Sequence, residues 1–327
     1  MQIAELSVLL VWGAATALTI ALVAFAIDLG RRTEQRADAR AEARTPVAVG
    51  AGAPAAAPPA DGKAAAPPAP ARRRAAGIAM STTWLGTALL LAAIVLRGIA
   101  AGRTPWANMY EFTLVGSFMA LAVFLGINLR KDLRFLGAFV TGLAVLFLVL
   151  GLNVFYVAAT GVQPALQNYW LVIHVGVAIC SAGIFTVAFV SSVLQLLRDS
   201  RDTGSPYLSR PGFRWLDRLP TPTSLEVLSF RLNAVGFVLW TFTIIGGAIW
   251  AEHAWGRYWG WDPKEVWSFV IWVVYAAYLH ARTTRGWDGR RAAWFVIVGY
   301  LCVLFNFTGV NLIFNGKHSY SGLTTDA

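Results

Sequence analysis

The stretch FLGAFVTGLAVLFLVLGLNVFYV, residues 135–157, contains no charged side chain. An α-helix of roughly 20 apolar residues crosses a hydrocarbon layer about 30 Å thick. The stretch is therefore predicted to be a transmembrane helix. The composition of the whole chain agrees, because 57% of its residues are hydrophobic and 13% are charged, with a mean hydropathy of +0.57. These values lie outside the usual range of soluble globular proteins.

Stretches of similar length and composition recur along the chain. They predict an all-α fold, a polytopic transmembrane helix bundle of about eight spans. The first stretch has no basic segment before it and is followed at once by Arg31 and Arg32. We therefore expect a retained span with its C-terminal end in the cytoplasm, not a cleaved signal peptide. The predicted spans lie near 5–28, 79–100, 108–129, 135–157, 169–196, 228–250, 266–283 and 292–314.

Lysine and arginine are distributed unevenly between the two sides of such a bundle. Alternating spans place 21 of the 27 Lys and Arg residues in four cytoplasmic segments, 31–78, 130–134, 198–218 and 282–291. The outer side has only Arg103, Arg257, Lys264 and Lys317. Since cytoplasmic loops carry the basic excess in membrane proteins, both termini are predicted to be extracytoplasmic. The net charge of +10 is thus explained by a lipid membrane, and no nucleic-acid partner is expected.

Residues 31–78 differ in composition from the rest of the chain. They are rich in Ala, Pro and Arg and cannot bury a core, which predicts a disordered cytoplasmic linker. The linker separates the first span, residues 1–30, from a seven-span domain, residues 79–327. The two cysteines, Cys180 and Cys302, lie far apart within apolar stretches. The sequence therefore offers no disulfide framework, no CxxC pair and no cysteine zinc site.

One predicted outer loop, residues 250–267, is unusually rich in tryptophan. Its sequence is WAEHAWGRYWGWDPKEVW. Asp262 has the side chain of a helix N-cap, Pro263 suits the first helical position, and Glu265 stands three residues after the cap, as in a capping box. The last part of this loop is therefore predicted to begin the seventh helix.

The aromatic residues of this loop have two interpretations. Tryptophan is common at membrane interfaces, where it anchors a protein at the headgroup level. Gly256 and Gly260, interleaved among the rings, allow sharp bends or the close approach of a flat ligand, which anchoring does not require. Arg257 and Lys264 are suited to pair with carboxylates on such a ligand. By residue type alone, a platform for a planar apolar ligand and a dense aromatic belt explain the loop equally well.

The four histidines add further candidates, because ionisable side chains at membrane depth are rare. His174, near the outer end of the fifth span, and His318, after the eighth, are expected on the same outer surface as the loop. Neutral imidazoles there suit the axial positions of haem iron, and the alternative is interfacial hydrogen bonding. His280 lies roughly 21 Å from the outer end at 1.5 Å per residue. It is either a satisfied polar residue or one ligand of a second site shared with a partner protein. His253 is interpreted as a solvated loop residue.

A longer pattern resembles a known family. The run Trp255-Gly-x-Tyr258-Trp259-Gly260-Trp261-Asp262-Pro263-Lys264-Glu265-x-Trp267 is similar to the WWD signature of the haem-handling proteins of cytochrome c biogenesis. Over roughly 80–327 the chain resembles the CcsA (ResC) subunit family of the system II cytochrome c synthase, called CcsB in some actinobacteria. Further matches are Asn108-Met-Tyr110-Glu111, Tyr169-Trp170-Leu-x-x-His174-Val, Tyr275, Tyr278-Leu279-His280-x-Arg282 and Gly316-Lys-His318-Ser-Tyr320.

The resemblance implies a function. Such a protein moves haem b to the outer face of the bacterial cytoplasmic (plasma) membrane. There, with a ResB-type companion subunit, it promotes thioether attachment to apocytochrome c, as part of a holocytochrome c synthase (haem lyase). His174 and His318 would be the outer axial ligands, and His280 a transmembrane ligand whose partner histidine belongs to the companion. No catalytic residue is implied beyond the haem-positioning site. The implied haem-binding residues of the loop are Trp255, Gly256, Tyr258, Trp259, Gly260, Trp261, Asp262, Lys264, Glu265 and Trp267.

Three other functions fit parts of the sequence. A haem exporter or chaperone would bind haem with the same loop and leave ligation to another protein. A membrane cytochrome with a permanent b-type haem would transfer electrons, but it favours paired histidines inside the membrane, where this chain offers only His280. A plain transporter would use the tryptophans only as a belt. Supplying an apocytochrome distinguishes the exporter or chaperone from a synthase. Only a synthase attaches haem to it covalently.

Overall fold

The computed structural model describes residues 2–42, 74–159 and 168–318, without the side chains of 31–42. In these residues all regular elements are helices, which confirms the predicted all-α class. Two 3-10 helices, η1 (Arg134–Leu136) and η3 (Pro211–Arg218), lie in connections. The α-helices are α1 (Ile3–Glu42), α2 (Arg74–Ala101), α3 (Met109–Asn128), α4 (Gly137–Asn153), α5 (Tyr169–Asp202), α6 (Pro222–Trp255), α7 (Pro263–Thr284), α8 (Gly289–Phe307) and the short α9 (Gly309–Ile313).

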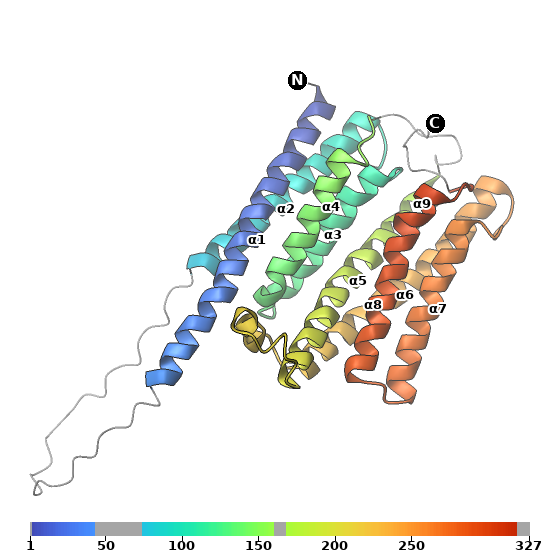
Figure 1. The fold of residues 1–327 in the computed structure, drawn as a ribbon. Coiled ribbons are helices and arrows are strands. Elements are labelled where there is room, and N and C mark those ends of the chain that lie inside the picture. The colour runs from blue at the N-terminus through green and yellow to red at the C-terminus, as the bar shows by residue number, and fades with distance from the viewer. Residues whose placement is uncertain (1, 43–73, 160–167, 319–327) are drawn as a thin grey trace, which may run out of the picture.

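The long helices correspond to the predicted spans. Seven of them are long and apolar enough to cross a membrane, and α7 is the long helix that falls outside this group. The tryptophans, tyrosines and His280 of α7 lower its hydropathy relative to its neighbours. In Figure 1, α7 nevertheless runs beside α8 over the same length of the bundle. The described part of the chain is therefore a polytopic helix bundle, as predicted.

Helix boundaries differ from the prediction around the linker. The first helix continues to Glu42, and α2 already begins at Arg74. Residues 31–42 are rich in Arg, Ala, Glu and Gln, which are strong helix formers, so polarity alone does not end the helix there. The remainder of the predicted linker, residues 43–73, lies outside the described residues, and its disorder stays a prediction.

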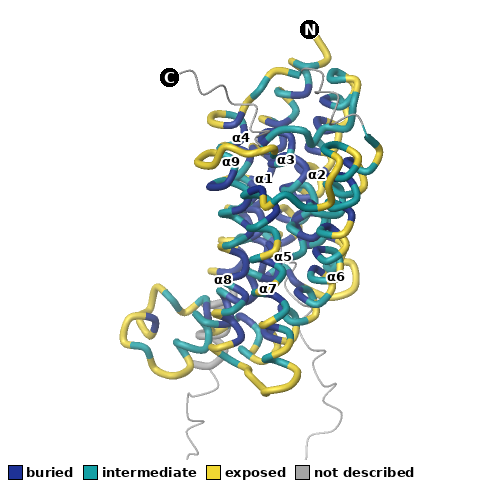
Figure 2. Tube along the Cα trace, turned by 90° about the vertical axis from the view of Figure 1, so that its right-hand side faces the viewer, coloured by how far each residue is buried: buried dark blue, intermediate teal, exposed yellow. Residues whose placement is uncertain are grey.

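The bundle consists of two groups of four helices. One group is α1 to α4 and the other α5 to α8, as Figure 1 shows. The second group joins the first through α5, which packs against α3 and α4 on one side and against α6 and α8 on the other. Buried residues follow the inward helix faces in Figure 2, whereas exposed residues gather at the ends and on outward faces. Helix α5 therefore lies where the two groups meet.

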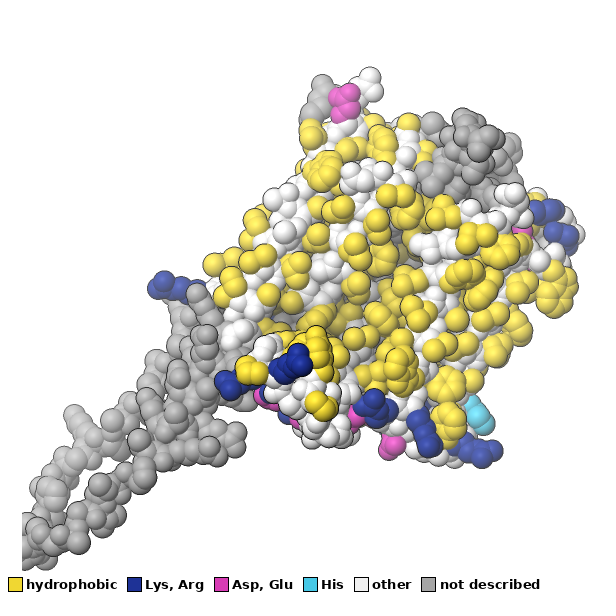
Figure 3. All heavy atoms as spheres, viewed as in Figure 1, with side chains coloured by type: hydrophobic (Ala, Val, Ile, Leu, Met, Phe, Trp, Pro, Cys, Tyr) yellow, Lys and Arg dark blue, Asp and Glu magenta, His cyan; other side chains and the backbone are white. Residues whose placement is uncertain are grey.

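The two ends of the bundle differ in charge. α1 begins, α6 ends and α9 lies at one end of the bundle, while the connection between α7 and α8 lies at the other (Figure 1). On the face seen in Figure 3, hydrophobic side chains cover the flank, and most visible Lys and Arg side chains lie toward the lower end. This distribution is the one that the positive-inside rule assigns to a cytoplasmic end. The orientation of the termini itself stays a prediction.

A buried ion cluster holds the connection between α2 and α3. Glu111, in the first turn of α3, is fully buried, and its carboxylate accepts hydrogen bonds from Arg97 Nε at 3.0 Å and Arg103 Nη1 at 2.6 Å. It also accepts from the backbone N–H of Ala107 at 3.0 Å. Arg97, 1% exposed, further donates to the carbonyl of Val157. The cluster therefore ties the start of α3 to α2 and to the segment that follows α4.

Replacing Glu111 by alanine should destabilise the protein strongly, because it leaves the Arg97 guanidinium buried without its carboxylate. Breaking a buried pair in this way typically costs about 3–5 kcal/mol. The measurement is the unfolding midpoint of the purified protein in detergent. Asp132→Ala is the matched control, since it removes an exposed pair with Arg134 that is expected to contribute less than about 1 kcal/mol. Equal midpoints for the two variants would contradict the structural role of the cluster.

Candidate functional site

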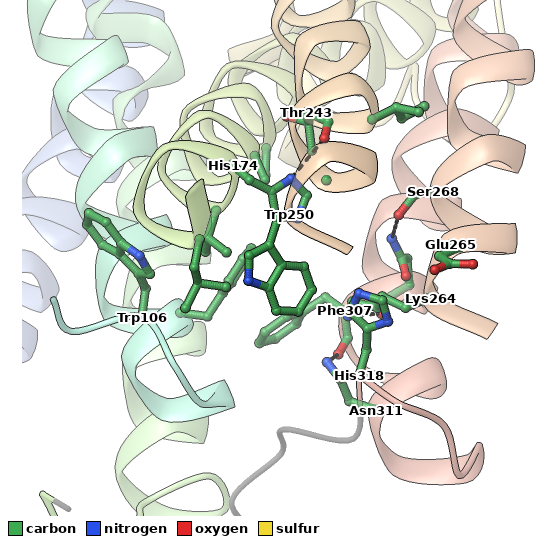
Figure 4. A pocket seen from close by; sticks show the side chains of 18 of the residues that line it. Trp106, His174, Thr243, Trp250, Lys264, Glu265, Ser268, Phe307, Asn311 and His318 are labelled. Atoms are coloured by element: carbon green, nitrogen blue, oxygen red, sulfur yellow. Dashed lines mark hydrogen bonds between the residues drawn. The ribbon is translucent and has the colours of Figure 1, made fainter. Parts of the chain in front are cut away.

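A cavity of about 190 Å³ lies at the end of the bundle where α6 ends and α7 begins. Side chains from α3, α5, α6, α7 and α8, and from the segments that follow α6 and α9, line it. Figure 4 shows Trp106 on one side of this cavity, Lys264 and Glu265 on the other, and Trp250 between them. The lining includes six of the residues singled out in the sequence: His174, Tyr258, Trp259, Lys264, Glu265 and His318.

His174 reaches the cavity from the second turn of α5. Its Nδ1 lies 2.8 Å from the carbonyl oxygen of Thr243 on α6, and since a carbonyl can only accept, Nδ1 carries the proton. The ring lies against Gly247, where an added Cβ would stand 2.7 Å from the imidazole. It also lies parallel to the Trp250 indole, with centroids 6.2 Å apart. The ring is therefore fixed in position and tautomer by α6.

His318 reaches the same cavity from the segment after α9. Its Nδ1 lies 2.8 Å from Asp262 Oδ2, so a charge-assisted hydrogen bond orients the ring. The imidazole also packs edge-to-face on Trp255, with centroids 4.8 Å apart, and contacts Trp250 at 5.6 Å. Trp250 thus packs against both histidine rings.

The two histidines share one arrangement. In each ring Nδ1 is hydrogen-bonded to an oxygen acceptor of the protein, Thr243 O for His174 and Asp262 Oδ2 for His318. In a neutral imidazole, a proton on Nδ1 leaves Nε2 as the acceptor, and this is the form in which an imidazole nitrogen binds a metal. Histidine ligands of metals usually have this second hydrogen bond. The structure therefore brings two imidazoles with ligand-like tautomers to one cavity.

Asp262 joins the start of α7 to the C-terminal segment. It is the N-cap of α7, where the predicted capping box with Glu265 is present. Its carboxylate accepts from the backbone N–H of Lys264 at 3.2 Å and of Lys317 at 2.6 Å, besides His318. Burial alone would raise the pKa of the Asp262 carboxyl, but the hydrogen bonds from His318 and from the two backbone N–H groups outweigh burial and lower this pKa. The group is therefore a buried carboxylate.

The loop in the Trp-rich segment is shorter than the predicted range, 250–267. Helix α6 continues to Trp255, and α7 begins at Pro263, so the connection is only 256–262. Gly256 ends α6 with a left-handed conformation, φ 71°, which favours glycine. Gly260 donates its N–H to Glu265 Oε2 at 2.8 Å. The glycines and Glu265 therefore shape the connection, and Trp255 belongs to the last turn of α6.

Several residues from the sequence prediction lie away from the cavity. Trp261 is 76% exposed and contacts Trp259 edge-to-face. Trp267 packs on Phe305 of α8, with ring centroids 4.4 Å apart, and does not line the cavity. His280 is exposed on α7 near its other end and is not brought to this site.

His253 also lies apart from the cavity. Its side chain is exposed, as predicted. However, His253 lies in the last turns of α6, where its Nδ1 is hydrogen-bonded to the carbonyl of Ile249. The loop predicted to contain it is helical there because α6 continues to Trp255.

Some lining residues were not among the predicted haem-binding residues. Trp106 precedes α3, Trp250 lies one turn before the end of α6, and Asn306 lies in the last turn of α8. Lys264 Nζ donates to the carbonyl of Asn306 at 2.7 Å, which links α7 to α8 at the cavity wall. The only sequence signal for Trp106 is its place next to Asn108 at the outer end of a span. It becomes a candidate only once α3 and α5 are seen to pack together.

Comparisons with known proteins agree on one family. The model described as "Cytochrome C assembly protein" matches residues 106–318. The cytochrome c biogenesis protein CcsA of Prochlorococcus marinus is 35% identical over 253 residues, covering 71% of this chain and 80% of that protein. CcsA of Gloeobacter violaceus is 35% identical over 278 residues, covering 71% and 82%.

A solved structure shares the fold. The cytochrome c haem lyase CcmF superposes with a TM-score of 0.63 at 16% identity, covering 98% of this chain and 49% of the other. The chain therefore spans about half the length of that protein, and at this identity the likeness shows the fold alone.

Asp262→Ala should release both segments that its carboxylate holds. Hydrogen exchange of the Lys264 and Lys317 amides is expected to rise about fivefold, because loss of an N-cap acceptor costs about 1 kcal/mol and 1.4 kcal/mol corresponds to a factor of about ten. The matched control is Asp288→Ala, since Asp288 occupies the N-cap position of α8 without a side-chain cap hydrogen bond. Unchanged exchange at Lys317 would mean that Asp262 does not hold the C-terminal segment.

Proposed function

The chain belongs to the CcsA family of cytochrome c assembly proteins, and we propose that it acts in c-type cytochrome biogenesis by holding haem b in its outer cavity for attachment to an apocytochrome. Haem is the substrate in this proposal. The observation that carries it is the pair His174 and His318, whose Nδ1-bonded rings line one cavity. Imidazoles of this kind are suitable axial ligands of haem iron.

The rest of the cavity supports a porphyrin as the ligand. Trp250, Tyr258 and Trp259 supply aromatic surface, and stacked aromatic rings bury a large apolar area with defined geometry. Lys264 adds an amino group at the wall formed by α7. In addition, Trp255 and Asp262 hold His318 without lining the cavity themselves. The proposed roles are therefore divided between residues that meet the ring and residues that position a ligand.

The attachment step needs no group on this chain to form a covalent bond. Each apocytochrome thiol adds across a vinyl group of haem, so that sulfur bonds to one vinyl carbon, hydrogen to the other, and the C=C bond becomes a single bond. Neither Cys180 nor Cys302 lines the cavity. Positioning is the contribution of the protein, since two reactants held correctly react as if they were one molecule. Transfer of the iron to a histidine of the apocytochrome would then release the product.

We assign this chain to a holocytochrome c synthase complex with a ResB-type companion subunit. His280 is exposed on α7, on the half of the helix away from the cavity. A histidine there is accessible to a neighbouring membrane protein, which is what a shared haem ligand requires. The chain would lie in the bacterial cytoplasmic membrane with its cavity on the outer face, where apocytochrome c is delivered.

Alanine at His174 or His318 should remove an axial ligand. Each variant, purified with its companion subunit, is expected to bind haem at the outer site at least about tenfold more weakly, with loss of the low-spin absorption spectrum, and to attach less haem to a supplied apocytochrome. Added imidazole should restore the spectrum, because it fills the vacated position.

His253→Ala is the matched control, since His253 is an exposed histidine at the same end of the bundle. It should bind and attach haem normally. If the double variant of His174 and His318 still matures cytochrome c at the unaltered rate, the axial-ligand proposal is wrong. Normal haem loading of the unaltered chain without any thioether product would instead support an exporter or chaperone.

His280→Ala tests the second site separately. In the complex with the companion subunit, it should lower total haem loading while the outer ligands still give their spectrum, because the outer cavity is untouched. Haem content is measured by absorption after extraction and compared with that of His174→Ala. Full loading of the His280 variant would remove the transmembrane site from the proposal.

A further inference from the structure

Two indole N–H groups at the cavity lack a partner. Trp106 Nε1 and Trp250 Nε1 are buried and make no hydrogen bond within the described part of the chain. Both residues line the cavity, one from the segment before α3 and the other from α6. In Figure 4 the nitrogen of each ring lies on the side that faces the other tryptophan. The cavity is therefore bordered by two buried hydrogen-bond donors that have no partner in the described residues.

Unpaired buried donors of this kind require an explanation. An indole N–H can only donate, and leaving it unbonded in a buried place is unfavourable. Elsewhere in the same helices the protein satisfies such groups: Trp240 Nε1, also at the cavity, donates to Ser268 O at 3.0 Å, and Trp272 Nε1 to Thr241 Oγ1 at 2.9 Å. The two unpaired donors are thus specific to one end of the cavity and call for an acceptor from a ligand.

Both rings are held in place. Trp250 is 1% exposed and packs between His174, His318 and Trp255. Trp106 lies against α5 at Gly176, where an added Cβ would stand 3.8 Å from its ring. Its segment is fixed to α3 by the Ala107 N–H bond to Glu111. Neither N–H group can therefore turn easily toward a partner within the protein.

The unpaired polar atoms differ between the two ends of the cavity. At the tryptophan end they are donors, the two indole N–H groups. At the α7 wall they are acceptors, Glu265 Oε1 and Asn306 Oδ1, and Lys264 Nζ there already donates to the carbonyl of Asn306 at 2.7 Å. A carboxylate therefore meets unpaired donors at the tryptophan end and unpaired acceptors at the α7 end.

We propose that Trp106 and Trp250 form the carboxylate-binding end of the haem site, each indole N–H donating to a porphyrin carboxylate. This inference rests on the proposed function, because the ligand it orients is haem. The two carboxylates of haem b lie on one edge of the ring and the vinyl groups toward the opposite edge. With the carboxylates between Trp106 and Trp250, the vinyl edge points toward α7 and the 256–262 connection. Trp106 and Trp250 then determine which edge of haem meets the apocytochrome.

The test combines a change in the protein with a change in the ligand. Trp106 and Trp250 are each replaced by benzothienylalanine, which keeps the ring shape but has sulfur in place of N–H. Full-length protein with its companion subunit is titrated with haem and with haem dimethyl ester, whose carboxylates are masked. Each replacement should weaken haem binding about tenfold and binding of the ester less than about threefold, since the lost hydrogen bond is to a charged acceptor.

Trp240→benzothienylalanine is the matched control, because that indole lines the same cavity and already bonds Ser268. Its effect should be equal for the two ligands. Equal weakening of haem and ester in the Trp106 and Trp250 variants, or no weakening of either, would overturn the inference while leaving haem binding itself intact. Failure of the unaltered protein to bind either ligand would instead overturn the proposed function.

Discussion

The carboxylate of Asp262 is the interaction on which the candidate site depends. It caps α7, accepts the backbone N–H of Lys317, and orients the imidazole of His318. A buried carboxylate requires several donors, and here they come from two segments more than fifty residues apart in the chain. One carboxylate thus places both the start of α7 and the C-terminal segment. His318, which follows the short helix α9, has a defined position because of these bonds. Glu265, bonded to the backbone of Gly260 and Asp262, stabilises the same turn from the other side.

The polar atoms around the cavity fall into two classes, those that bond another part of the protein and those left for a ligand. The side chains of three residues donate hydrogen bonds to backbone carbonyls of neighbouring helices: His174, Trp240 and Lys264. These bonds fix α5, α6, α7 and α8 relative to one another. Trp106, Trp250, Glu265 and Asn306 each keep a buried polar atom without a partner in the described chain, and all four line the same cavity. Because buried polar groups are normally bonded, their concentration here indicates where the protein by itself is incomplete.

The sequence was sufficient for some features and not for others, and the reasons are physical. Apolar length predicts the helices because a bilayer demands it, and the Asp262-Pro263-Glu265 capping pattern is local, so it could be recognised without a structure. The ends of α1 and α6 were misplaced because helix formers such as Ala, Glu and Arg extend a helix beyond the apolar stretch. The part played by Trp106 depends on the packing of its segment against α5, and no spacing in the sequence encodes that contact.

Helix α7 connects the two depths at which the chain carries candidate ligands. Lys264 and Glu265 stand at its N-terminal start, and His280 lies 16 residues after Lys264, about 24 Å at 1.5 Å per residue. Between them, Tyr275 stacks on Phe185 of α5 with centroids 4.0 Å apart and lies against Gly299 of α8. This packing fixes the axial position of α7, so the cavity and His280 keep a constant separation. Helix α7 falls outside the group of apolar spans because it carries these polar and aromatic side chains. The same side chains place both candidate sites on one rigid helix.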